Sequence, residues 1–173
     1  AYQHYGMGVS LKLIKSINQK ILKDSKTLSK KKREELFIYI KKNSIWAIGQ
    51  ASVSEIQKIN ILYASLLAMK RAILKLKKKP SLVLIDGNKI PNLQNYNLKY
   101  VIKGDSKIPS ISAASIIAKV SRDKFITTLS KKYKNYGWNT NSGYGTKEHL
   151  RAIKKFGITK YHRKTFSPIF KFK

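Results

Sequence analysis

The sequence contains no cysteine, so neither a disulfide framework nor a thiolate metal site is available to it. It has no apolar run near the roughly 18 residues that a transmembrane helix needs, and its N-terminus lacks the order of a signal peptide. These absences predict a soluble protein of the cytoplasm. Acidic residues are also scarce, with eight Asp and Glu against 37 Lys and Arg.

This imbalance gives the 173 residues a formal net charge of +29. Self-repulsion of that size opposes a compact fold unless a polyanion neutralises it, so a nucleic acid is the first partner to consider. Codon bias explains part of the lysine content, and a ribosomal-type binder or a merely lysine-rich enzyme are the alternatives. The length and the 42% of hydrophobic residues predict a single domain over 1–173, with an atypical start at 1–20 and a helix and basic tail at 146–173.

Two of the few acidic residues follow short β-rich runs. An apolar run, residues 82–85, ends at Asp86, and residues 98–103 repeat the pattern before a glycine and Asp105. The pattern predicts two strands that deliver both carboxylates to the carboxyl edge of a sheet. Mg²⁺ takes oxygen ligands, and two such ions can stabilise both the attacking water and the leaving oxygen of a phosphoryl transfer. The alternative is that each Asp merely belongs to a turn.

Hydrophobic periodicity predicts the remaining elements. They are a helix after Ser29, a strand over residues 46–51, a helical region after Ser52 or Ser54, a helix from about Pro109 past Leu129, and a helix from Thr146 to about Phe156. The helical region after residue 52 includes Ile59 and Leu62 on its predicted core face, and we interpret Asn60 as a joint between two helices. Residues 7–17 fit either a strand or a helical face. A basic membrane-surface protein is a weaker alternative, because the basic helices also carry core-type apolar faces.

An aromatic and glycine-rich loop, residues 135–146, places Tyr144 between two glycines. A tyrosine with so few local partners can protrude and stack on a sugar or base, whereas a core tyrosine is the competing interpretation. Asp123 falls within a helix beside Arg122, which predicts an ion pair and not a metal ligand. We expect the basic tail, residues 161–166, to lie over the surface.

Six segments carry a resemblance to a known family: DSKTLSKKKREEL, INILYASLLAM, LVLIDGN, VIKGDSKIPSISAASIIAKVSRD, GYGTKEHL and HRKTFSP. In this order and spacing, over about residues 23–168, they closely resemble bacterial ribonuclease HII. The resemblance implies an α/β, ribonuclease H-like fold with a mixed β-sheet flanked by helices and a helical C-terminal part. It also implies hydrolysis of the RNA strand of RNA–DNA hybrids, and nicking 5′ to ribonucleotides embedded in DNA, with Mg²⁺ or Mn²⁺.

The resemblance implies roles for individual residues. Asp86 and Asp105 correspond to two of the family's four metal-binding, catalytic carboxylates. Tyr144 looks like the tyrosine that stacks on the deoxyribose beyond the ribonucleotide. Three further residues match polar positions of the family motifs and are carried over only as substrate-binding or supporting groups: Lys26, Asn60 and Lys119.

The main departure from the family lies at the N-terminus. The family's first strand carries a DEAGRG-type motif with the other two carboxylates, whereas no Asp or Glu precedes Asp24 in this sequence. Three explanations remain: a fragment or rearranged copy of an enzyme, an enzyme in which residues 7–17 replace the strand, or a non-catalytic relative that binds RNA–DNA hybrids. We expect a monomer with severely weakened catalysis, because two carboxylates make an incomplete metal site.

Overall fold

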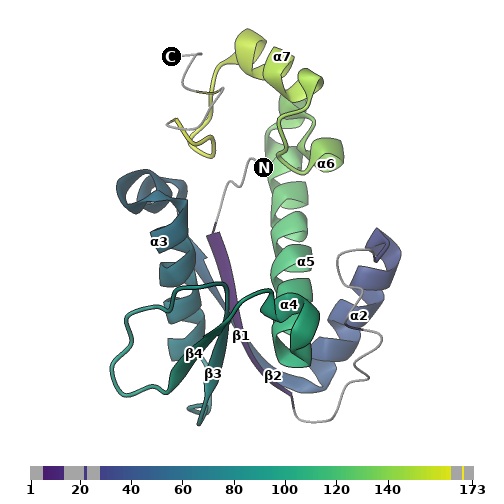
Figure 1. The fold of residues 1–173 in the computed structure, drawn as a ribbon. Helices are drawn as coiled ribbons and strands as arrows, with labels where there is room; N and C mark the ends of the chain where they lie inside the picture. Colours follow the sequence, from purple (N-terminus) through teal and green to yellow (C-terminus); the bar gives the residue numbers. More distant parts are fainter. Residues whose placement is uncertain (1–5, 14–21, 23–27, 165–168, 170–173) are drawn as a thin grey trace. The chain divides into compact units, whose positions relative to one another are not determined.

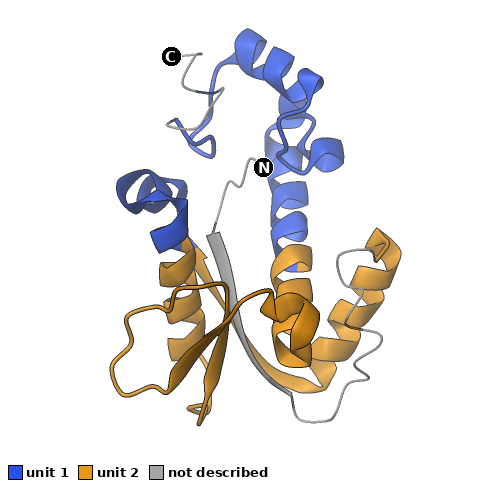
Figure 2. Ribbon diagram, viewed as in Figure 1, with its two compact units in different colours: residues 1–6, 51–64, 121–173 blue, residues 7–50, 65–120 orange. Residues whose placement is uncertain are grey.

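The computed structural model describes residues 6–13, 22, 28–164 and 169, and for residues 6–13 only the backbone (Figure 1). The elements in chain order are β1 Gly6–Leu13, α2 Lys30–Lys42, β2 Ser44–Ala51, α3 Val53–Leu74, β3 Val83–Asp86, β4 Leu98–Val101, α4 Gly104–Lys107, α5 Pro109–Lys132, η1 Lys134–Tyr136, α6 Trp138–Asn141 and α7 Lys147–Phe156. The chain divides into two compact units (Figure 2). Unit 1 comprises residues 1–6, 51–64 and 121–173, and unit 2 comprises 7–50 and 65–120.

The strands among the described residues form two two-stranded sheets and lie in unit 2, except that Gly6 and Ala51 at the ends of β1 and β2 belong to unit 1. The first sheet pairs β1 with β2, so the residues whose type the sequence left open form a strand as far as Leu13. The second sheet pairs β3 with β4 in parallel, so the carboxyl ends of both strands lie at the same edge, as predicted. Within the described ranges, no helix combines the length and apolar character of a membrane span.

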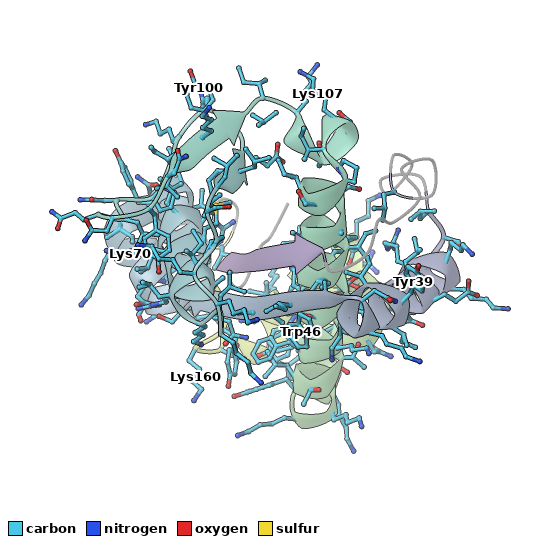
Figure 3. All side chains as sticks on the ribbon, turned by 90° about the horizontal axis from the view of Figure 1, so that it is seen from below. Tyr39, Trp46, Lys70, Tyr100, Lys107 and Lys160 are labelled. Carbon is cyan, nitrogen blue, oxygen red and sulfur yellow. The ribbon has the colours of Figure 1, made fainter. Side chains whose placement is uncertain are left out.

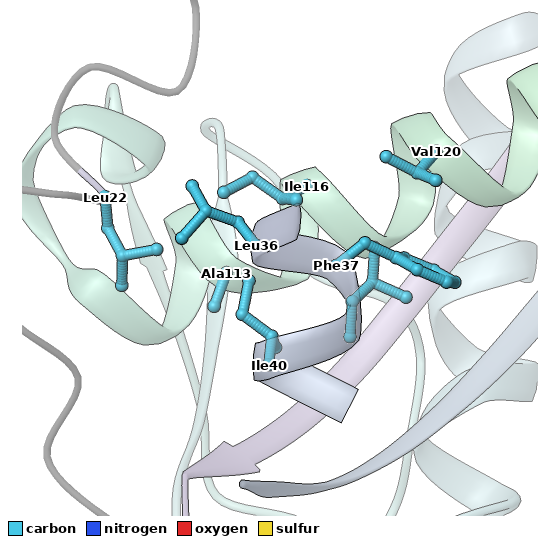
Figure 4. Packing of buried hydrophobic residues seen from close by; sticks show 8 residues of the cluster. Leu22, Leu36, Phe37, Ile40, Ala113, Ile116 and Val120 are labelled. Carbon is cyan, nitrogen blue, oxygen red and sulfur yellow. The ribbon is translucent and has the colours of Figure 1, made fainter. Parts of the chain in front are cut away.

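A hydrophobic cluster joins α2 to α5 in unit 2 (Figure 4). The predicted apolar positions of α2, namely Leu36, Phe37 and Ile40, are all buried there. Ser29 caps the helix as expected, because its hydroxyl accepts a hydrogen bond from the Lys32 backbone N–H at 3.2 Å. The small residues at the start of α5 allow this packing, and Ala113 lies fully buried within the cluster.

The α3 helix lies against β2 at unusually close range. A Cβ added at Gly49 of β2 would stand 2.0 Å from the carbonyl oxygen of Ala68 and 2.5 Å from the backbone nitrogen of Ala72. Both alanines are fully buried, so a stripe of small residues forms this contact. Only glycine leaves room for the helix backbone at this position of the strand.

The N-terminal part of α3, in unit 1, departs from the predicted core face. Ser52 begins the helix with a capping box, since its hydroxyl accepts from the Glu55 backbone N–H at 3.2 Å and its own backbone N–H donates to the Glu55 carboxylate at 2.8 Å. The helix then breaks at Asn60, whose φ of 60° lies outside the helical region, which confirms the predicted joint. Ile59 and Leu62 are exposed, contrary to the prediction, because the break interrupts the helical period on which that prediction relied.

The core of unit 1 is aromatic and includes residues that the sequence placed in a loop or on the surface. Tyr136 of η1 and Trp138 of α6 are buried, with ring centroids 5.3 Å apart in a stacked arrangement. His162 and Arg163 are also buried, so the expectation of a surface tail is wrong for these two residues. The predicted ion pair of Asp123 is confirmed, since its Oδ1 lies 3.1 Å from Nη1 of Arg122.

Candidate functional site

Asp86 is the last residue of β3 and stands at the carboxyl end of the parallel pair. The strand buries Val83 and Ile85 and leaves the Asp86 side chain exposed. Gly87 follows with a φ of 114°, and its N–H donates to the carbonyl oxygen of Val101 at 3.1 Å. The strand therefore ends on a fixed turn that presents one carboxylate to solvent.

Asp105 reaches the same edge of the sheet through the turn after β4. Lys103 adopts a left-handed conformation, and α4 begins at the next residue. The N–H of Gly104 donates to Oδ1 of Asp86 at 2.8 Å, so the residue directly before Asp105 is bound to the Asp86 side chain. A Cβ at Gly104 would lie 2.6 Å from Cδ1 of Ile111 and 3.4 Å from that oxygen, so glycine permits this close approach. Asp105 itself is 8% exposed.

Basic side chains flank this pair of carboxylates. Lys103 and Lys107 stand on either side of Asp105 in the chain, and both are exposed. Figure 3 shows Lys107 and Tyr100 near the turn between β4 and α4, among side chains whose nitrogen tips reach outward. Two carboxylates within a cationic surface can accept a divalent ion while the lysines hold phosphate groups.

The donor chemistry of Asp86 and Asp105 fits a hard divalent ion. Carboxylate oxygens are the ligands that Mg²⁺ and Mn²⁺ prefer, and Mg²⁺ keeps several waters when it binds through one or two carboxylates and substrate phosphates. Among the described residues, no group of three or more His, Cys, Asp and Glu is placed to hold a metal ion. Asp86 and Asp105 therefore fit an ion whose remaining ligands are waters and the oxygen atoms of a bound phosphate.

Tyr144 lies in unit 1, and its side chain is 40% exposed. It is not isolated, because the Arg122 guanidinium lies over the ring at 5.5 Å from the centroid. Arg122 is itself held in place by the Asp123 carboxylate and by the carbonyl oxygen of Ser142, which accepts from Nη2 at 3.0 Å. The structure thus gives Tyr144 a fixed neighbour and a partly exposed ring.

The structure describes two of the other three residues that were predicted to bind substrate, Asn60 in unit 1 and Lys119 in unit 2. Asn60 lies in unit 1, where its side-chain oxygen accepts from the backbone N–H groups of Leu62 and Tyr63 at 3.0 and 3.2 Å and so caps the second part of α3. Lys119 is half-buried in the part of α5 that belongs to unit 2. Lys26 lies outside the described residues. Their predicted roles in binding substrate stay predictions.

A buried histidine pair in unit 1 was not anticipated from the sequence. Nε2 of His149 lies 3.1 Å from Nε2 of His162, and both side chains are 1% exposed. Burial lowers the pKa of both, and that of His162 falls to about 4, with the neighbouring His149 adding to the effect. One feature of the sequence could have indicated this pair, because two of the three histidines follow the aromatic segment at residues 133–138.

Comparison with known proteins gives matches along nearly the whole chain. The family model described as "Ribonuclease HII" matches residues 6–171. A ribonuclease HII of Pelagibacter ubique is 84% identical over 154 residues, which cover 89% of this chain and 83% of that protein. A ribonuclease HII of Anaplasma marginale is 50% identical over 150 residues, which cover 87% of this chain and 62% of that protein.

Two solved structures share the fold at low sequence identity. The ribonuclease H2 of Pyrococcus horikoshii superposes with a TM-score of 0.72 at 24% identity and covers 97% of this chain and 96% of its own. Bst-RNase HIII in complex with Mn²⁺ gives a TM-score of 0.70 at 18% identity and covers 98% of this chain and 64% of its own. The predicted α/β, ribonuclease H-like fold with flanking helices is thereby confirmed.

Proposed function

This chain belongs to the ribonuclease HII family, and we propose that it hydrolyses the RNA strand of RNA–DNA hybrids and nicks DNA 5′ to embedded ribonucleotides. Membership makes it an endonuclease of a divalent-metal-dependent family that acts on RNA–DNA hybrids. The observation that supports the proposal most directly is the hydrogen bond from Gly104 to Asp86, which brings Asp86 and Asp105 to one sheet edge. We further propose that the two units act as one monomeric domain in the cytoplasm.

In this proposal Asp86 and Asp105 hold the divalent ion, Mg²⁺ or Mn²⁺. When bound, one such ion would activate water as a nucleophile, and a second would stabilise the charge on the leaving 3′-oxygen. The Gly104 N–H fixes the orientation of the Asp86 carboxylate before any ligand arrives, and the first turn of α4 holds Asp105. Lysine and arginine side chains position the phosphates without reading the base sequence. Tyr144 stacks on the sugar beyond the ribonucleotide.

A divalent ion takes several oxygen ligands, so further carboxylates would strengthen the site that we assign to Asp86 and Asp105. Residues 6–13 form the β1 strand and pair with β2, which supports the proposal that this part of the chain contributes a strand to the enzyme's fold. The second candidate function is binding of RNA–DNA hybrids without cleavage, which the net charge of +29 supports by itself.

A nicking assay separates the two candidates. The full chain is incubated with a labelled duplex that carries one ribonucleotide, first with Mg²⁺ and then with Mn²⁺, and with an all-DNA duplex as the substrate control. Asp86→Asn is compared with Glu35→Gln, which removes an exposed carboxylate on α2 that pairs with the exposed side chain of Lys32 at 3.1 Å. Nicking lost in Asp86→Asn and kept in Glu35→Gln supports the enzyme. Binding of the duplex without any nick supports the non-catalytic candidate.

A further inference from the structure

The contacts of His162 define which of its nitrogens carries the proton. The backbone N–H of Thr159 donates to Nδ1 of His162 at 2.9 Å, so this nitrogen presents a lone pair. In the neutral ring the proton is then on Nε2. That nitrogen faces Nε2 of His149 at 3.1 Å and donates to it.

The contacts of His149 indicate the other tautomer, in which Nδ1 carries the proton and Nε2 does not. Its Nε2 accepts from the Trp138 indole N–H at 3.2 Å, as well as from His162, and therefore carries no proton. The proton of His149 is then on Nδ1, which lies 2.9 Å from the carbonyl oxygen of Tyr144. The hydrogen bonds form one directed chain from Thr159 through both imidazoles to the Tyr144 backbone.

We propose that His149 and His162 are positioning residues that hold the backbone of Tyr144 through this chain of hydrogen bonds. The inference rests on the proposed contact of Tyr144 with the substrate sugar and identifies what fixes that side chain in place. A stacking residue must be held in a defined position to check a junction, and a rigid supporting shell provides this.

The backbone around Tyr144 needs such support. Ser142 and Gly143 both have positive φ, at 49° and 76°, so a tight turn precedes the tyrosine. The N–H of Tyr144 donates to the carbonyl of Asn141 at 2.8 Å, and its own carbonyl accepts from the Thr146 N–H at 2.9 Å. These bonds are local to the turn, whereas the bond from His149 connects the turn to the buried core of unit 1.

The surroundings keep both histidines neutral, as the chain of hydrogen bonds requires. The rings that face His162 are those of Tyr136 and Trp138, with centroids at 5.1 and 5.4 Å, and the same two rings face His149 at 6.2 Å. A second proton on either imidazole would remove an acceptor nitrogen that another N–H needs. It would also place a charge among aromatic side chains, which desolvation opposes.

The tautomers can be measured in the free protein by ¹⁵N NMR, without any nucleic acid. We expect His149 protonated on Nδ1 and His162 protonated on Nε2 at neutral pH. A His149 ring protonated on Nε2 could not donate to the Tyr144 carbonyl, so that result would overturn the inference whatever the protein binds.

Two amide replacements at His149 test the hydrogen bond itself. In His149→Asn the amide N–H occupies the place of Nδ1–H, whereas in His149→Gln the amide reaches the place of Nε2 and the bond to Tyr144 is lost. We expect the ¹⁵N heteronuclear NOE of Gly143, Tyr144 and Gly145 to fall in the glutamine variant and to be retained in the asparagine variant. Equal loop order in both variants, each verified as folded by its spectrum, would refute the positioning role.

A double-mutant cycle connects the pair to nucleic-acid binding. Affinity for a duplex with one ribonucleotide is measured for His149→Gln, Tyr144→Ala and the combination. We expect His149→Gln to lower affinity about fivefold, as for the loss of one hydrogen bond, and to have no further effect once Tyr144 is alanine. The same loss in both backgrounds would show a general structural effect and contradict the inference. If Tyr144→Ala alone leaves the affinity for the duplex unchanged, the proposed contact of Tyr144 with the substrate is refuted. The tautomers and the order of the loop then still test whether the histidines position the Tyr144 backbone.

Discussion

Acidification should destabilise this protein through its buried histidine pair. Burial and the neighbouring His149 lower the pKa of His162 to about 4, from an ordinary value of 6.5. Between these two values the unfolded chain binds a proton that the native protein does not bind. The contribution of His162 to stability is therefore complete above about pH 6.5 and is lost progressively as the pH falls towards 4.

The size of the effect follows from the two pKa values. For His162 alone, linkage predicts a loss of about 2 kcal/mol in the free energy of unfolding when the pH falls from about 7 to about 5. The pKa of His149 is also lowered, mainly by burial, and contributes with the same sign. Both histidines are only 1% exposed, so water screens their electrostatic interactions little. With a urea m-value of about 2 kcal/mol/M, the midpoint should fall by about 1 M.

Urea unfolding at the two pH values measures this loss directly. The matched control is His162→Gln, whose amide N–H can still donate to His149 but does not titrate in this range. The control should be less stable at pH 7, because Nδ1 no longer accepts from Thr159, and should lose much less stability on acidification. A variant that loses as much stability between pH 7 and pH 5 as the unaltered chain would refute the assignment of the effect to His162.

Three substitutions test the backbone geometry. Gly49→Ala should lower the free energy of unfolding by at least about 1–3 kcal/mol, because its Cβ would overlap the carbonyl oxygen of Ala68. An unchanged midpoint of thermal unfolding would contradict the close contact of α3 with β2. Gly87→Ala should lower the free energy of unfolding by about 1–2 kcal/mol, because its φ of 114° disfavours a side chain while open space surrounds the added Cβ. A clearly larger loss in urea unfolding would indicate a clash and contradict this explanation. Thr146→Ala should cost about 1 kcal/mol in urea unfolding, because the hydroxyl caps α7 by accepting from the His149 N–H, and Thr146→Ser should restore it.

The sequence predicted those features that depend on neighbouring residues. The caps at Ser29 and Thr146 were readable because a hydroxyl accepts from an N–H only three residues further along the chain. The placement of Asp86 and Asp105 was predictable for a similar reason, since Asp86 ends a short apolar strand and Asp105 follows a second short β-rich run after one turn. Parallel pairing of those runs then brings the two carboxylates to one edge without further information.

A local break in one helix and long-range contacts in the core of unit 1 explain the predictions that failed. The exposure of Ile59 and Leu62 follows from the positive φ of Asn60, which changes the phase of α3 in a way that a count of apolar residues does not register. The burial of His162 depends on Trp138 and His149, which lie 24 and 13 residues earlier in the chain. A basic segment such as residues 162–164 predicts an exposed surface, and only the packing of the aromatic core shows that its histidine is buried. Residues that orient a functional side chain through the core are therefore the part of such a site that sequence patterns reveal least.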